Sequence, residues 1–348
     1  MLQDDRHGGR YKKPYGPTNL PVAFGVRFRD IHGNTEARTL STMSPTARFS
    51  LLQVFRLLRP KQWIKNGFVF APLVFARELF EPSLLLLTLR AFAAFCCTAS
   101  AVYIINDFAD LESDRAHPEK KYRPLAAGTI GTPHALTLLT LLLAAAVVGA
   151  AGMDIRFQFI LGAYFAINLA YSWKLRQVFL LDVFIIAAGF MLRVLGGAYA
   201  IGVTVSSWLV LCSLFISLFL GFAKRRGELA QTGPSAENTK RKTLLVYRVD
   251  FVDQLLTVAA AGTVISYALY TVAPRTIEVF GTDRLIYTTV FVMYGVFRYM
   301  YLVHTSSSVE NPTGALTTDI PIIINGFLWI AVCIFLIYFG GSIPGLSR

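Results

Sequence analysis

Residues 89–105 read LRAFAAFCCTASAVYII, and residues 106–124 continue directly as NDFADLESDRAHPEKKYRP. The first stretch is apolar apart from Arg90, Thr98 and Ser100, which is typical of a helix that crosses a membrane. The second stretch is crowded with acidic side chains and then with basic ones. Because this polar segment follows an apolar helix without a break, it predicts a chemical site at the membrane boundary.

The composition places the chain among membrane proteins. It has 348 residues, of which 54% are hydrophobic and only 16% are charged, whereas soluble domains are about 25% charged. Backbone polar groups in lipid must be bonded within their own segment, so the apolar runs predict helices. We therefore expect an all-α, polytopic membrane protein with about nine transmembrane helices. The expected segments are residues 64–80, 84–106, 133–151, 156–173, 178–199, 205–224, 252–273, 284–303 and 321–341.

Lysine and arginine predict the orientation. If the N-terminus lies in the cytoplasm, most basic residues between the segments are cytoplasmic, as the positive-inside rule requires. The polar site is then cytoplasmic in a multi-pass protein of the inner (plasma) membrane. The same rule accounts for the net charge of +12, so we expect no nucleic-acid partner. Residues 1–48 are polar and predict a poorly ordered cytosolic extension, followed by one catalytic domain at 49–348.

Asp107, Asp110 and Asp114 are spaced three and then four residues apart. On a helix this spacing places them on one face. Three such carboxylates repel one another unless a cation lies between them, and their hard oxygens suit Mg²⁺ that also binds substrate phosphates. An Asp at the centre of a bilayer would cost about 2.5–3.5 kcal/mol, so these residues should line a polar cavity or the interface. We predict that they bind Mg²⁺, with Asn106 beside them as an amide oxygen or a donor.

The basic residues after the acidic face suit a phosphate ligand. Lys120, Lys121 and Arg123 provide cations that can bind phosphate oxygens. A solvated acidic loop would have a similar composition, but these acids continue a membrane helix. His117, before Pro118, suits a structural hydrogen bond as well as a catalytic role. The segment therefore predicts a site for a metal-bound diphosphate at the cytoplasmic mouth of a helical bundle.

The pattern N-D-x-x-D-x-x-x-D after a membrane helix resembles the UbiA superfamily of intramembrane prenyltransferases. Within it, the chain is similar to the branch that transfers 5-phosphoribose to a polyprenyl phosphate such as decaprenyl phosphate. The similar stretches are LRPKQWIKNGFVFAPLVFA (58–76), NDFADLESDRAHPEKKYRPLAAG (106–128), YSWKLRQVFLLDVFIIAAGFMLRVLGGA (171–198), GFAKRRGEL (221–229) and FRYMYLVH (297–304). The resemblance implies a bacterial, all-helical enzyme with a cytoplasmic Mg²⁺–diphosphate site above a lipid tunnel. As a candidate role it implies cell-envelope glycolipid synthesis, including arabinan precursors of a cell wall.

Further site residues follow from this resemblance. Tyr171, Arg176 and Asp182, at or near a short inside turn, are expected to contact the ribose 5-phosphate or its hydroxyls. Lys174, in the same turn, is equally well explained as a membrane anchor. The candidates to bind the lipid phosphate or to support the site are Lys61, Lys65, Asn66, Arg193, Lys224, Arg225 and Arg226. For the last three, the positive-inside rule and lipid headgroups offer an alternative explanation.

The main hypothesis is Mg²⁺-dependent transfer of 5-phosphoribose from 5-phosphoribosyl 1-diphosphate to a polyprenyl phosphate. Membrane lipids surround such a protein, and a second copy of the chain is a further candidate partner. A prenyltransferase for an aromatic or other small acceptor would share the first motif. The resemblance implies a second D-x-x-x-D for that enzyme, but no acid follows Asp182 four residues on. A transporter or channel predicts paired helix breaks, which we do not find, and an inactive scaffold conflicts with the intact acidic motif.

Overall fold

The structure is a computed structural model, and it describes residues 51–231, 246–305 and 318–339. The polar extension expected at residues 1–48 lies outside this described part. The described residues form helices and connections, with no β-strand among them, which confirms the all-α prediction. The elements are α1 (Leu51–Leu58), η1 (Pro60–Phe70), α2 (Ala71–Phe75), α3 (Pro82–Ala109), α4 (Leu111–Arg115), η2 (Lys120–Tyr122), α5 (Thr132–Ala150), α6 (Ile155–Trp173), η3 (Leu175–Gln177), α7 (Leu181–Ala200), α8 (Ser207–Gln231), α9 (Val249–Val272), α10 (Pro274–Phe280), η6 (Arg284–Thr288), α11 (Thr289–Thr305) and α13 (Ile320–Phe339).

The long helices confirm a polytopic membrane protein. Within the described ranges, seven are long and apolar enough to cross a membrane, namely α3, α5, α7, α8, α9, the η6–α11 segment and α13. α6 is also 19 residues long, although it is not among those seven. These helices lie where the sequence predicts segments, from residues 84–106 onward.

The first expected segment, residues 64–80, does not form a continuous membrane-length helix. It is divided between the 3₁₀ helix η1 and the short helix α2. Pro72, in the first turn of α2, has no backbone N–H for the preceding turn and so favours a new helix start there. The segment instead packs closely on α7, where a Cβ atom on Gly197 would overlap the carbonyl oxygen of Val69. Hydrophobicity alone does not separate such a packed connection from a membrane span.

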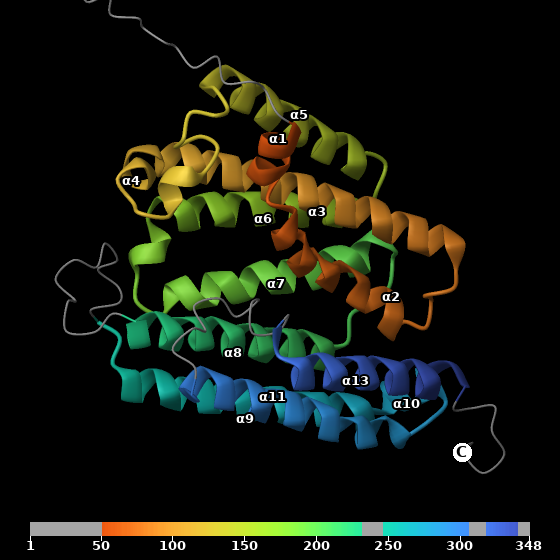
Figure 1. Ribbon diagram of the computed structural model, residues 1–348. Coiled ribbons are helices and arrows are strands. Elements are labelled where there is room, and N and C mark those ends of the chain that lie inside the picture. The colour runs from red at the N-terminus through yellow and green to blue at the C-terminus, as the bar shows by residue number, and fades with distance from the viewer. Residues whose placement is uncertain (1–50, 232–245, 306–317, 340–348) are drawn as a thin grey trace, which may run out of the picture. The chain divides into compact units, whose positions relative to one another are not determined.

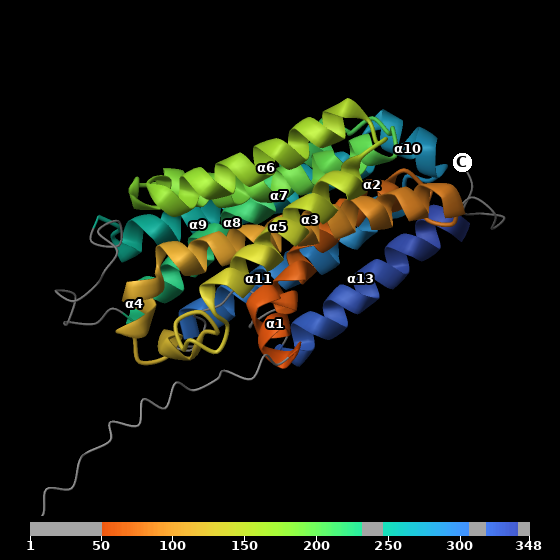
Figure 2. The same cartoon turned by 90° about the horizontal axis from the view of Figure 1, so that it is seen from above.

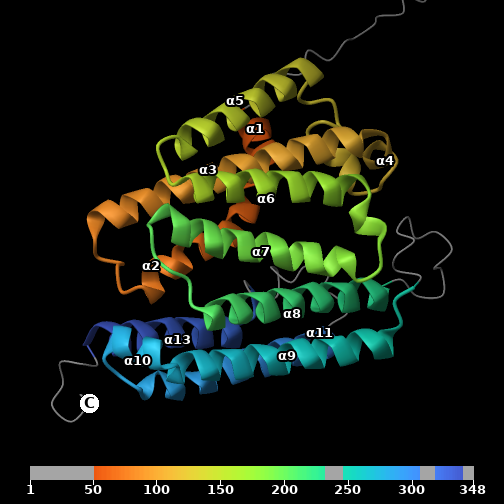
Figure 3. The same cartoon turned by 180° about the vertical axis from the view of Figure 1, so that it is seen from behind.

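The long helices lie side by side in the described domain (Figures 1 and 3). Their order runs from α5 through α3 and α6 to α7, then α8, and then α9, α11 and α13. α7 is central, because it packs against α3, α6, α8 and η1. One apolar cluster joins α7, α8, α9 and α11, and a second joins α3, α6 and η1. α7 therefore contributes to the packing on both sides of the bundle.

Two ends of this bundle can be defined (Figure 2). The acidic end holds the end of α3, the start of α7 and the end of α8. The far end holds the start of α3, the end of α7 and the end of α9 with α10. The connection after α6 lies at the acidic end, because Arg176 of η3 contacts Asp110 after α3. The distinction matters because the predicted site lies at the acidic end alone.

Candidate active site

The acidic motif spans the junction of α3 and α4. Asp107 lies in the last turn of α3, Asp110 joins the two helices, and Asp114 lies within α4. Asp107 and Asp114 are each only 2% exposed, whereas the Asp110 side chain is 30% exposed. Two of the three predicted metal ligands are thus taken out of water, where an unpaired charge would be costly.

Arginines compensate the two buried carboxylates. Arg123 Nη1 lies 3.2 Å from Asp107 Oδ1 and 2.6 Å from Asp114 Oδ2, so it bridges both. Arg59 Nη2 also contacts Asp107 Oδ1. The structure therefore places Arg123 at the acidic motif, where the sequence predicts a phosphate-binding cation.

The more exposed carboxylate has its own arginine. Arg176 Nη2 lies 3.3 Å from Asp110 Oδ1. Arg176 belongs to η3, between α6 and α7, so this pair connects the α6–α7 turn to the end of α3. Three guanidinium groups thus face three carboxylates at one site.

Arg59 is a site residue that sequence reasoning missed. It lies between α1 and η1, with φ 54° and ψ 57°, in the left-handed region that non-glycine residues rarely occupy. That conformation costs roughly 1–2 kcal/mol, and the ion pair with Asp107 helps to hold it. Its place in the stretch 58–76, one of the stretches that carry the family resemblance, was the available signal.

Two buried oxygens at the motif suit a cation. Asn106 Oδ1 and Asp107 Oδ2 have no hydrogen-bond partner among the described residues. Such orphaned oxygens are costly unless something binds them. The same part of the chain holds no preassembled group of three or more metal-binding side chains, because the carboxylates turn to arginines instead. The donor set nevertheless fits a hard divalent ion, which Asn106 and the three aspartates could hold after these ion pairs rearrange.

The remaining residues of the motif lie in the following loop. Lys120 and Lys121 form η2 and are exposed. His117 Nδ1 accepts hydrogen bonds from the backbone N–H groups of Glu119 (3.2 Å) and Lys120 (3.3 Å). The histidine therefore stabilises the turn that presents both lysines, which corresponds to the structural alternative for this residue.

A second buried carboxylate, Asp182, is bonded by the protein itself. It is 1% exposed. Tyr247 donates its hydroxyl to Asp182 Oδ1 at 2.7 Å, and Arg225 Nε lies 2.6 Å from Asp182 Oδ2. Arg225 also pairs with Glu228 and lies 3.5 Å from the hydroxyl of Tyr171. The structure thus joins three predicted site residues in one network.

Tyr247 connects this network to a strained backbone position. Its hydroxyl accepts the N–H of Leu180 at 3.0 Å, and Leu180 has φ 62° directly before α7. Burial, and then the hydrogen bond to Asp182, raise the pKa of Tyr247, so its hydroxyl stays protonated and donates. Tyr247 and Glu228 were not predicted, because no short sequence spacing links them to Asp182.

A cationic group lies beside these two carboxylate networks. Arg193 Nε donates to Asn66 Oδ1 at 2.7 Å, and Nη2 donates to the Tyr164 hydroxyl at 2.8 Å. Burial, with the nearby charges of Lys224 and Arg193, lowers the pKa of Lys65 to about 8. Four of the predicted lipid-phosphate candidates are therefore neighbours.

The last two candidates, Lys61 and Arg226, have surroundings different from those of the cationic group. Lys61 is exposed at the start of η1. Arg226 turns towards α9, where its Nε lies 2.8 Å from Asp253 Oδ1, and His304 of α11 lies 3.4 Å from the same oxygen. Arg226 thus links α8, α9 and α11, while its neighbour Arg225 faces Asp182.

Two bacterial proteins that share one name are similar in sequence to this chain. The chain is 34% identical to decaprenyl-phosphate phosphoribosyltransferase of Corynebacterium glutamicum over 224 residues, which are 62% of this chain and 66% of that protein. It is also 34% identical to the protein of that name from Mycolicibacterium smegmatis, over 62% of this chain and 69% of the relative. The alignments thus span about two thirds of each relative.

A solved structure has the same fold. A UbiA homolog from Archaeoglobus fulgidus, bound to GPP and Mg²⁺, superposes with a TM-score of 0.61 at 20% identity. The superposition covers 82% of this chain and 99% of the homolog. The model of the UbiA prenyltransferase family matches residues 67–329, which are most of the chain and include all three aspartates and Asp182. The chain therefore belongs to the UbiA prenyltransferase family.

Proposed function

We propose that the protein transfers 5-phosphoribose from 5-phosphoribosyl 1-diphosphate to a polyprenyl phosphate, such as decaprenyl phosphate, and releases diphosphate. The observation that carries this proposal is the acidic motif surrounded by arginines, with two buried oxygens that lack hydrogen-bond partners within the described ranges. Such a site suits a metal and a diphosphate together. The names of the two bacterial relatives supply the sugar and the lipid.

The Asp182 network favours this donor over a prenyl diphosphate. Family resemblance implies that a prenyl-diphosphate enzyme carries a second pair of acids for a second metal ion. Here Asp182 is bonded on one oxygen by Tyr247 and on the other by Arg225. Both side chains of the Asp182–Arg225 pair are buried, whereas the Asp110–Arg176 pair is about one third exposed and can open to a cation. The site is therefore suited to a single metal-bound diphosphate.

Asn106, Asp107, Asp110 and Asp114 would hold Mg²⁺, which when bound neutralises charge on the departing diphosphate. With the carboxylates holding the cation, Arg59, Arg123 and Arg176 would be able to donate to diphosphate oxygens. The guanidinium groups then stabilise the leaving group directly.

Bond exchange at C1 of the ribose completes the reaction. The C1–O bond to the diphosphate breaks, and its electron pair leaves on the diphosphate oxygen. An oxygen of the lipid phosphate forms the new bond to C1 from the opposite face. Because the lipid phosphate is already an anion at neutral pH, no strong general base is needed. Lys65, Lys224 and Arg193 are the cations that we assign to hold this acceptor in line.

An assay of the purified full chain tests the proposal. The protein is incubated with Mg²⁺, radiolabelled 5-phosphoribosyl 1-diphosphate and decaprenyl phosphate, and the lipid is extracted into organic solvent. We expect label in the lipid phase, and we expect EDTA to abolish it. A parallel tube contains a prenyl diphosphate and aromatic acceptors. Consumption of the prenyl diphosphate, with no labelled lipid in the first tube, would replace the proposal by a conventional prenyltransferase reaction.

A further inference from the structure

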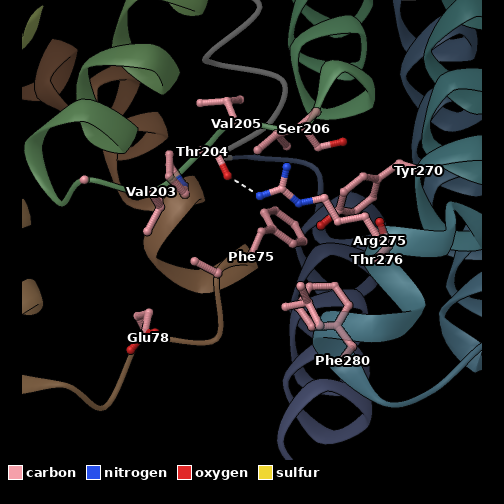
Figure 4. Close-up of a pocket in the computed structure, with 15 residues that line it drawn as sticks. Phe75, Glu78, Val203, Thr204, Val205, Ser206, Tyr270, Arg275, Thr276 and Phe280 are labelled. Atoms are coloured by element: carbon pink, nitrogen blue, oxygen red, sulfur yellow. Dashed lines mark hydrogen bonds between the residues drawn. The ribbon is translucent and has the colours of Figure 1, made fainter.

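A cavity of about 340 Å³ lies at the far end of the bundle (Figure 4). It is lined by the end of α2 with the loop to Glu78, the α7–α8 connection, the end of α9, and α10. The α3 helix begins just after the loop that lines the cavity and ends at the acidic motif. With 28 residues, α3 is about 42 Å long. A ligand in this cavity therefore does not touch the proposed donor site.

One half of the cavity is polar. Arg275 reaches in from α10, and its Nη2 donates to the hydroxyl of Thr204 in the α7–α8 connection (Figure 4). Ser206, Tyr270 and Thr276 add further hydroxyl groups to the lining. A guanidinium has five N–H donors in a planar fork, and it binds phosphate oxygens two at a time. This half therefore suits a phosphate ester.

The other half of the cavity is apolar. Phe75, Val279 and Phe280 form part of its wall, and Val279 is exposed at its edge. A phosphate-binding half next to an apolar half, at the end of membrane-spanning helices, matches the headgroup and glycerol region of a lipid.

The position of Arg275 needs an explanation beyond the usual distribution of charge. The predicted orientation places the far end on the extracytoplasmic side, where arginine and lysine are scarce. Arg275 is exposed but directs its guanidinium to the cavity lining, as its bond with Thr204 shows. A general preference for cytoplasmic basic residues does not account for such a side chain.

We propose that this cavity binds a phospholipid of the leaflet opposite the active site. Its phosphodiester lies against Arg275, Thr204 and Ser206, and its acyl chains leave past Phe75 and Phe280. A soluble polyanion is a poorer match, because Arg275 is the one cation among the described residues that line the cavity, and Glu78 lies in its wall. The bound lipid joins the α2 loop, the α7–α8 connection and α10 at one point.

Mass spectrometry of intact protein–lipid complexes tests this site. The full chain is purified in mild detergent, supplied with phosphatidylglycerol, and compared with Arg275→Gln and with Arg156→Gln. Arg156 is a matched control, because it is an exposed arginine near Tyr199 at the same end of α7 but outside the cavity lining. Loss of a charge-assisted hydrogen bond predicts that Arg275→Gln lowers the lipid-bound fraction by about tenfold or more. Equal retention by all three proteins would overturn the proposal.

Two further measurements separate the alternatives. Thr204→Val removes the hydroxyl that positions Arg275 and should lower lipid retention by a few-fold, with Arg275 still present. Inorganic phosphate should leave the bound phospholipid in place, and its displacement of the lipid would instead indicate a site for a soluble anion. Transfer activity is measured on the same samples. Because Arg275 lies outside the proposed active site, loss of lipid with intact transfer would support this inference independently of the proposed reaction.

Discussion

Asp107 and Asp182 lie in the same half of the bundle and are almost equally buried, at 2% and 1% exposure. The two carboxylates differ in the contacts that their oxygens make. Asp182 has Tyr247 on one oxygen and Arg225 on the other. Asp107 has both of its arginines on Oδ1, and Oδ2 has no hydrogen-bond partner in the described part of the chain. Burial alone therefore does not distinguish the two aspartates. The difference is that Arg225 forms an ion pair with Asp182 Oδ2, whereas Asp107 Oδ2 has no such partner among the described residues.

The largest expected effect is on Asp107. Asp107→Asn keeps the size of the side chain but removes the charge that would bind Mg²⁺. We expect transfer to fall by about 10²–10³-fold, as when one charge-stabilising group is removed from an active site. The initial rate of label transfer is measured over a series of Mg²⁺ concentrations. Asp250→Asn is the control, because Asp250 is an exposed aspartate near the start of α9, with 82% of its side chain accessible. Turnover at the wild-type rate in Asp107→Asn would remove this residue from the metal site.

The second effect is on stability, and it distinguishes Asp182 from Asp107. Removing one partner of a buried ion pair costs about 3–5 kcal/mol, because the other charge is left unpaired. We therefore expect Arg225→Met to lower the free energy of unfolding by that order, measured by denaturation in detergent. The double variant Arg225→Met/Asp182→Leu should recover much of the loss.

The Mg²⁺ requirement gives the control for this second prediction. Asp182→Asn should leave the Mg²⁺ concentration at half-maximal rate unchanged, because Tyr247 donates a hydrogen bond to Asp182 Oδ1 and Arg225 forms an ion pair with Oδ2. A large shift in that concentration, without loss of stability, would show that Asp182 is a metal ligand and that the two aspartates are alike.

The third effect concerns the cation beside the two networks. The pKa of Lys65 is lowered to about 8 by burial and by Lys224 and Arg193. Lys65 is therefore charged at pH 7 and becomes neutral as the pH rises through 8. If it holds the lipid phosphate, kcat/KM for the acceptor should fall above pH 8, by up to about tenfold per pH unit. Lys65→Arg should move this decline to higher pH, because arginine stays charged. An unchanged pH profile in Lys65→Arg would exclude Lys65 as its source.

Local spacing predicted the parts of the site that lie close together in the chain. The three aspartates, Asn106 and Arg123 fall within 18 residues, so the chain keeps them close together, although the helix is interrupted at Asp110 and Arg123 follows η2. Contacts across long separations were not predictable in this way. Arg59 lies 48 residues before Asp107, and Tyr247 lies 65 residues after Asp182. Their roles depend on how α1, α3, α7 and α9 pack.

The fold, like the site, could be predicted from the sequence only where local sequence decides the structure. Apolar length predicted the spans from α3 onward, because a membrane helix is defined by its own composition. It failed at residues 64–80, where the decisive feature is close packing of η1 on Gly197 of α7. The hydrophobicity of a segment indicates that it is shielded from water, but it does not indicate whether lipid or protein surrounds the segment.

The smallest expected effect compares two buried tyrosines. Tyr247 and Tyr299 are 4% and 2% exposed. The hydroxyl of Tyr247 bonds both Asp182 and the N–H of Leu180, whereas that of Tyr299 has no hydrogen-bond partner in the described ranges. Tyr247→Phe should therefore lower the free energy of unfolding by about 1–2 kcal/mol.

Tyr299→Phe is the matched control, since it removes a hydroxyl of the same kind at similar burial. It should leave the stability unchanged or raise it, because an unsatisfied buried hydroxyl costs free energy in the folded state. Both variants are compared by denaturation in the same detergent. Equal losses would mean that the Tyr247 bonds add nothing beyond burial. Asp182 would then be held by Arg225 alone, and its contrast with Asp107 would rest on that single ion pair.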